Sequence, residues 1–151
     1  MLREAFSERL KQAMKARDAR TTSTVRLILA ALKERDVATR GEGKSQALAD
    51  PDISRMLQGM VKQRRESIAL YQQGKREDLA AQEREEIAII ESFLPRQLGE
   101  AETEAAVRAA IAETGAAAIK DMGKVMALLR ERHTGTIDLG RASAAAKRLL
   151  G

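Results

Sequence analysis

Hydrophobic residues recur at spacings of three and four along most of the chain, which is the pattern of amphipathic α-helices. In residues 2–93 this spacing predicts four helices, and the first two are expected to form an antiparallel pair. No stretch alternates β-branched or aromatic residues with polar ones, so we predict no strands. The expected fold is all-α, with helices over residues 2–14, 18–37, 50–73 and 76–93.

Local signals mark the ends of these helices. Asp18 is a candidate N-cap of the second helix, and Asp50 is a candidate N-cap of the third, with Pro51 at its first helical position. Gly74 is expected to end the third helix, as glycine does past a C-terminus. Residues 39–50 contain two glycines and little periodicity, so we expect a mobile connection there.

Pro95 marks the expected boundary between two domains, because proline cannot continue a helix and disfavours helical geometry at the preceding residue. The predicted domains are residues 1–94, a bundle of about four helices, and residues 95–151. The second domain contains short pieces that cannot be stable alone and are expected to form a compact cluster. These pieces are residues 101–113, 121–132 and 139–150. Asp138 is a candidate N-cap of the last one, and Asp121 is a candidate N-cap or first-turn residue of the one before it.

Composition narrows the class of protein. Apolar residues make up 44% of the chain, which indicates a globular protein, and only two Phe and one Tyr are aromatic. The absence of cysteine excludes disulfides and thiolate sites. The N-terminus lacks an apolar signal core, and no apolar run approaches the ~20 residues that span a bilayer. We predict a soluble, cytoplasmic protein without membrane contact, and a monomer.

The net charge of +5 is unevenly distributed. Residues 120–151 hold seven basic and three acidic residues, and residues 1–50 hold eleven and seven. A basic surface can bind phosphates, although ordinary solvation is the alternative. The C-terminal region has no aromatic residue to stack a base, so shape and phosphate contacts are the expected mode. The candidate nucleic-acid contacts are Lys120, Lys124, Arg130, Arg132, Arg141, Lys147 and Arg148, with Lys62 and Arg65 on the third helix.

The stretch 120–129 has the most recognisable local pattern. Gly123 and Lys124 lie near a predicted helix start, where phosphate can bind, or where glycine can simply permit close helix packing. The pattern is not a P-loop, because it lacks the earlier glycine and the Ser or Thr after the lysine.

Other candidate residues have structural interpretations. Arg64 falls near the apolar stripe of its helix and is expected to pair with Glu83 or Glu86. His133 is the only histidine and is expected at a helix end. No serine has a nucleophile-elbow context, and neighbouring carboxylates face different ways. We therefore predict no catalytic residue, no metal site and no cofactor.

Five separated segments resemble the YqeY-like proteins in sequence and in order. They are STVRL at 23–27, VKQRRES at 61–67, GKREDL at 74–79, FLPRQL at 93–98 and DMGKVM at 121–126. The part from about Pro95 onward is also similar to the tail domain of the GatB component of the glutamine-dependent aspartyl/glutamyl-tRNA amidotransferase.

The resemblance implies an all-α protein of two domains, the second related to a tail that helps engage tRNA. It also implies amidotransferase-like carbon–nitrogen ligase activity with glutamine as amido donor. Three hypotheses follow: a tRNA-binding accessory protein without its own catalytic centre, a component of such a ligase, and a helical adaptor that binds another protein.

Overall fold

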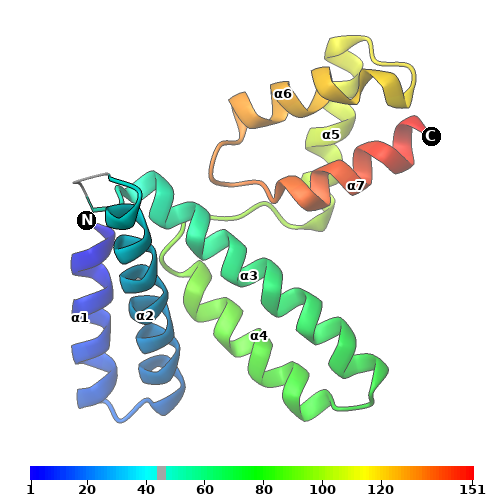
Figure 1. Cartoon of the computed structure of the whole chain (residues 1–151). Helices are drawn as coiled ribbons and strands as arrows, with labels where there is room; N and C mark the ends of the chain where they lie inside the picture. Colours follow the sequence, from blue (N-terminus) through cyan, green and yellow to red (C-terminus); the bar gives the residue numbers. More distant parts are fainter. Residues whose placement is uncertain (44–46) are drawn as a thin grey trace. The chain divides into compact units, whose positions relative to one another are not determined.

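The computed structural model describes residues 1–43 and 47–151, and within these ranges every regular element is helical (Figure 1). Seven α-helices and one short 3₁₀ helix are present there, which confirms the predicted all-α class. The chain divides into two compact units, Met1–Leu94 and Pro95–Gly151. We call them the first and the second unit. That each is an independent folding domain stays a prediction.

The first unit consists of two helical hairpins (Figure 1). Helix α1 packs against α2, α3 packs against α4, and α2 also contacts α4. The buried core is aliphatic apart from one ring, Phe6, which meets Phe93 edge-on at 4.8 Å between ring centroids. The guanidinium of Arg9 lies 4.9 Å from the Phe93 ring centroid. The helices are α1 (Leu2–Lys15), α2 (Ala19–Gly41), α3 (Asp50–Gln73) and α4 (Glu77–Glu91).

Two of the four predicted helix signals in this unit, Asp18 and Gly74, are confirmed. The carboxylate of Asp18 accepts a hydrogen bond from the backbone N–H of Thr21, so Asp18 is the N-cap of α2. Gly74 is the C-cap of α3. The prediction for Asp50 is wrong, because α3 begins at Asp50 itself and Ala49 precedes it as N-cap. The Asp50 carboxylate instead accepts from the Leu2 N–H, 48 residues away.

The connection between α2 and α3 differs from the prediction. Residues 39–41 form the last turn of α2, and residues 44–46 lie outside the described ranges. Leu48 is tied to the unit on both sides. Its N–H donates to Asp36, and its carbonyl accepts from Arg3. Arg3 also donates two hydrogen bonds to the Asp36 carboxylate, at 2.8 and 2.9 Å, and holds the pKa of that carboxyl below its ordinary value.

The second unit is a cluster of three α-helices in which each helix contacts the other two. Gly115 ends α5 in the left-handed region, at φ 68°. Thr103 is buried on α5, and its hydroxyl has no hydrogen-bond partner in the described parts of the chain. The elements are α5 (Glu100–Thr114), the 3₁₀ helix η1 (Ile119–Asp121), α6 (Met122–Arg132) and α7 (Leu139–Leu150).

Short polar contacts complete this unit. The Leu98 N–H donates to the Thr136 carbonyl, and the Gln97 amide donates to the Gly135 carbonyl. Asp138 accepts from two N–H groups at the start of α7, which confirms it as an N-cap. Asp121 occupies the predicted N-cap position of α6, but its carboxylate makes no capping bond to that helix. Its carboxylate accepts from the N–H groups of residues 117 and 118, and these bonds lower its pKa.

Candidate functional site

The seven predicted contacts of the second unit fall into two groups. Arg132 on α6 pairs with Glu113, and Arg148 on α7 pairs with Glu104 at 3.3 Å. Both partners lie on α5, so these two arginines join helices. The other five are exposed and make no ion pair within the described ranges: Lys120, Lys124, Arg130, Arg141 and Lys147.

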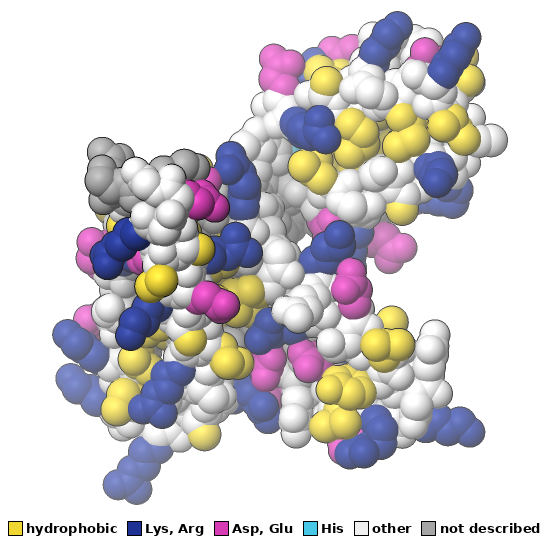
Figure 2. Space-filling model, in the orientation of Figure 1, with side chains coloured by type: hydrophobic (Ala, Val, Ile, Leu, Met, Phe, Trp, Pro, Cys, Tyr) yellow, Lys and Arg dark blue, Asp and Glu magenta, His cyan; other side chains and the backbone are white. Residues whose placement is uncertain are grey.

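These five cations are spread around the unit. Lys124 and Arg130 are six positions apart on α6, which places them about 120° apart around an ideal helix. Arg141 and Lys147 are likewise six apart on α7. Figure 2 shows a row of hydrophobic side chains across this unit, with Lys and Arg side chains on more than one side of it. This arrangement suits a ligand that presents phosphates over a broad surface.

The acidic side chains of α5 are mostly engaged. Glu102 accepts from Arg96, and Glu104 accepts from Arg108 as well as pairing with Arg148. The hydrogen bonds from Arg108 and Arg148 lower the pKa of Glu104, and those from Arg132 lower the pKa of Glu113. Acidic charge therefore gathers on α5 and is locally compensated, while α6 and α7 hold the positive excess.

The two candidate contacts on α3 differ from each other. Lys62 is exposed. Arg65 is half-buried and donates to Glu91 of α4 at 3.1 Å, so its charge contributes to the packing of α3 on α4. As nucleic-acid contacts, both stay predictions.

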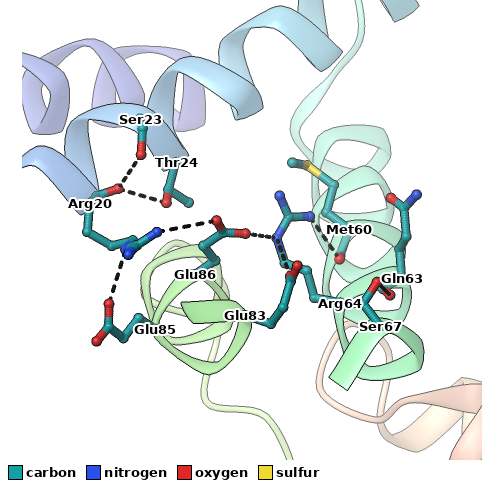
Figure 3. A network of polar contacts seen from close by, with 10 residues as sticks. All are labelled: Arg20, Ser23, Thr24, Met60, Gln63, Arg64, Ser67, Glu83, Glu85 and Glu86. Atoms are coloured by element: carbon teal, nitrogen blue, oxygen red, sulfur yellow. Dashed lines mark hydrogen bonds and ion pairs between the residues drawn. The ribbon is translucent and has the colours of Figure 1, made fainter. Parts of the chain in front are cut away.

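A network of charges joins three helices of the first unit (Figure 3). Arg64 on α3 donates to Glu86 on α4 at 2.8 Å, and its Nε lies 3.9 Å from Glu83, which confirms the predicted pairing. Arg20 on α2 donates to Glu85 at 3.1 Å and lies 4.0 Å from Glu86. The three glutamates carry one more charge than the two arginines.

Burial in this network affects Glu83. Its pKa is raised, first by desolvation and then by the neighbouring Glu86 carboxylate, while the Arg64 guanidinium opposes the shift. Sequence reasoning identified Arg64 but missed Arg20. The partners of Arg20 lie 65 and 66 positions away, and no local pattern indicates them.

The serines of the two N-terminal motifs are not activated nucleophiles. The hydroxyl of Ser23 donates to the Arg20 carbonyl at 3.1 Å, and that of Ser67 donates to the Gln63 carbonyl at 3.2 Å (Figure 3). A nucleophilic serine needs an adjacent base and an orienting group. Thr24 is buried and donates to the same Arg20 carbonyl at 2.8 Å. These hydroxyls satisfy helix carbonyls.

The remaining candidates have structural positions. His133 is the C-cap of α6, and its carbonyl accepts from the Thr136 and Ile137 N–H groups. Lys124 lies in the first turn of α6, and a Cβ added to Gly123 would meet nothing within 4 Å, so close packing does not require this glycine.

No group of three His, Cys, Asp or Glu able to hold a metal occurs among the described side chains. None of the described helices is long and apolar enough to span a membrane.

Similar yeast proteins carry the name altered inheritance of mitochondria protein 41, mitochondrial. The one from Kluyveromyces lactis is 32% identical over 89 residues, which are 59% of this chain and 46% of that protein. The one from Vanderwaltozyma polyspora is 31% identical over 85 residues, covering 56% and 44%. The one from Saccharomyces cerevisiae strain YJM789 is 33% identical over 86 residues, covering 56% and 44%.

This chain thus spans less than half the length of the curated relatives that it matches. Their name places those proteins in mitochondria, and a cytoplasmic location of this chain stays a prediction. The sequence profile of the Yqey-like proteins matches residues 3–150, which span nearly all of both units and all five motifs. The chain therefore belongs to the Yqey-like protein family.

Proposed function

We propose that this protein is a tRNA-binding accessory protein, related to the tRNA-dependent amidotransferase and without a catalytic centre of its own. The observation that carries the proposal is the positive excess on η1, α6 and α7. Five exposed cations there have no ion-pair partner among the described residues, whereas the carboxylates of the unit lie mainly on α5, where most of them accept from arginines.

The chemistry of this surface favours phosphates over bases. Residues 95–151 contain no Phe, Tyr or Trp, so base stacking of the kind used for single strands has no platform there. Lysine and arginine contacts to a folded RNA instead release counterions, which makes the affinity fall with salt. A structured RNA such as tRNA presents phosphates over a broad surface, and the spread of the five cations suits that ligand.

The test is a filter-binding titration of unfractionated tRNA at several salt concentrations. We expect binding at ~50 mM salt and an affinity that falls linearly on logarithmic axes. Replacing Lys124 and Lys147 with alanine should reduce the magnitude of the slope by about 1.4–1.8, since each phosphate contact contributes about 0.7–0.9. The matched control replaces Lys11 and Lys15 of α1, which are also exposed and unpaired in the described structure.

Two results would contradict the proposal. One is the absence of tRNA binding at ~50 mM salt, or binding without a salt slope. The other is an equal loss in the control variant, which would indicate a general effect of net charge rather than contact through the second unit.

In this proposal, other proteins carry out the amide transfer. The hydroxyls of Ser23 and Ser67 donate to helix carbonyls, and no metal-binding group is present in the part of the chain that the structure describes. We expect the purified protein alone to convert no mischarged tRNA in the presence of glutamine and ATP. Turnover by this chain alone would refute the accessory role and favour the ligase alternative.

A further inference from the structure

Helix α2 has a second hydrophobic face that no other described helix of the first unit covers. Its buried residues, such as Val25 and Ile28, contact the neighbouring helices. On the opposite side, Leu27 is 49% exposed and Val37 is 59% exposed, and Ala30 between them is exposed as well. Covering large apolar side chains of such exposure with a partner lowers the free energy of the complex.

The spacing of this face is that of a helix-pairing seam. Leu27, Ala30, Glu34 and Val37 follow one another at intervals of three, four and three. At about 100° per residue they lie within an arc of about 80°. Alternating intervals of three and four are the pattern with which one helix packs lengthwise against another. The face therefore suits a helix better than a globular surface or a small molecule.

Three cations line one edge of the seam. Arg26, Lys33 and Arg40 are seven positions apart, so they lie in one row that extends about 21 Å along the helix. All three are exposed, and none makes an ion pair within residues 1–43 and 47–151. On the face drawn in Figure 2, hydrophobic side chains lie among Lys and Arg side chains over α1 and α2.

We propose that this face of α2 docks an acidic amphipathic helix of a partner protein. We call it the α2 outer face and define it by Arg26, Leu27, Ala30, Lys33, Val37 and Arg40. Its seam, which is apolar except for Glu34, would pack against the apolar stripe of the partner, and its cationic edge would meet aspartates or glutamates that flank that stripe. The proposal is independent of tRNA binding by the second unit.

Charge pattern argues against a second copy of the chain as the occupant. In an antiparallel pair of α2 helices the two cationic edges would face each other and repel. In a parallel pair the cationic edge would face the other edge of the seam, where Ala31 and Ala38 carry no charge. In neither arrangement does a carboxylate line the edge that faces the cations, since Glu34 lies within the seam. A nucleic acid would compensate them, but its phosphates would gain nothing from Leu27 and Val37.

The test is an NMR titration of the full ¹⁵N-labelled chain with two synthetic helical peptides. Both peptides carry leucines at seam positions; one carries glutamates along the flanks and the other carries lysines. We expect the glutamate peptide to shift signals of the α2 outer face and to bind about tenfold more tightly than the lysine peptide. In the variant R26E/K33E we expect the preference to invert.

Two further variants separate charge from packing. K11E/K15E on α1 makes the same change in net charge and should keep the wild-type preference. Leu27→Ser with Val37→Ser removes exposed apolar groups and should weaken binding of both peptides. Since all these positions are exposed, circular dichroism should show unchanged helix content.

Four results would overturn the proposal. The first is the absence of peptide-induced shifts on α2. The second is a peptide preference that R26E/K33E leaves unchanged. The third is concentration-dependent shifts of the α2 outer face without peptide, which would show self-association. The fourth is displacement of the peptide by tRNA together with tRNA-induced shifts on this face, which would make it part of a nucleic-acid surface.

Discussion

Arg64 pairs with two glutamates. Replacing the arginine should therefore cost more unfolding free energy than replacing one of the glutamates. The side chains of Arg64, Glu83 and Glu86 are 12%, 20% and 18% exposed. Replacing Arg64 with methionine keeps the apolar stem but leaves two half-buried carboxylates facing each other. Only Arg20, 4.0 Å from Glu86, would remain as a cation beside them.

The expected cost of R64M is about 2–3 kcal/mol of unfolding free energy. Breaking a fully buried ion pair costs about 3–5 kcal/mol, and the remaining exposure of these side chains reduces that figure. Glu86→Gln should cost only about 1 kcal/mol, because Arg64 keeps Glu83 as a counterion and loses one charged hydrogen bond. E86Q also removes the like charge that raises the pKa of Glu83.

The two variants should also differ in their dependence on pH. Arg64 opposes the upward shift of the Glu83 pKa, so R64M raises that pKa further. A carboxyl whose folded pKa exceeds its unfolded value destabilises the fold while it is ionised. This cost is complete above the folded pKa and disappears as the pH falls toward the unfolded value of about 4.3. The cost of R64M should therefore shrink from pH 7 to pH 5.

Urea denaturation followed by tyrosine fluorescence measures the unfolding free energy of the first unit, which contains all of these residues. Tyr71 is the only tyrosine and the chain has no tryptophan, so the signal reports on α3 of the first unit. Equal costs for R64M and E86Q at both pH values would refute the reasoning, because they would mean that the two glutamates do not compete for one guanidinium.

Three more predictions concern single residues. Ile28→Ala, at a fully buried position, should cost about 2–5 kcal/mol of unfolding free energy in the same tyrosine-monitored urea assay, and a smaller cost would mean that the core collapses around the change. Gly115→Ala should lower the stability of the second unit by about 1–2 kcal/mol in a calorimetric scan, because φ is 68° and no clash adds to the strain. Asp36→Asn should destabilise the first unit at pH 7. Arg3 lowers the folded pKa of Asp36, so its contribution is complete above the unfolded pKa of about 3.9 and is lost as the pH falls through the folded value; the two proteins should converge in acid-titration circular dichroism.

Features that depend on neighbouring residues could be predicted from sequence. Asp18 and Asp138 cap helices through N–H groups two or three residues away, so their role is encoded locally. Arg64 was also predictable, because helical periodicity places it beside the apolar stripe, where a counterion is required. Asp50 also lies at the start of a helical pattern, but its partner is the N–H of Leu2.

Features that depend on distant partners could not be predicted. Arg20 meets α4 only after the two hairpins pack, and Leu48 is held by Arg3 and Asp36 from α1 and α2. The candidate contacts illustrate the same limit. Arg141 and Arg148 are seven positions apart, which places them on one side of α7. Only the structure shows that Arg148 meets Glu104 and that Arg141 has no ion-pair partner in the described residues.

The buried hydroxyl of Thr103 offers a way to make the second unit easier to study. The side chain is 3% exposed, and its oxygen has no hydrogen-bond partner in the described structure. Valine has nearly the same shape without the polar atom, so Thr103→Val should raise the thermal midpoint of this unit. Such a protein would provide a reinforced background for multiple charge variants of α6 and α7. Losses of RNA binding in that background could then be separated from losses of folding.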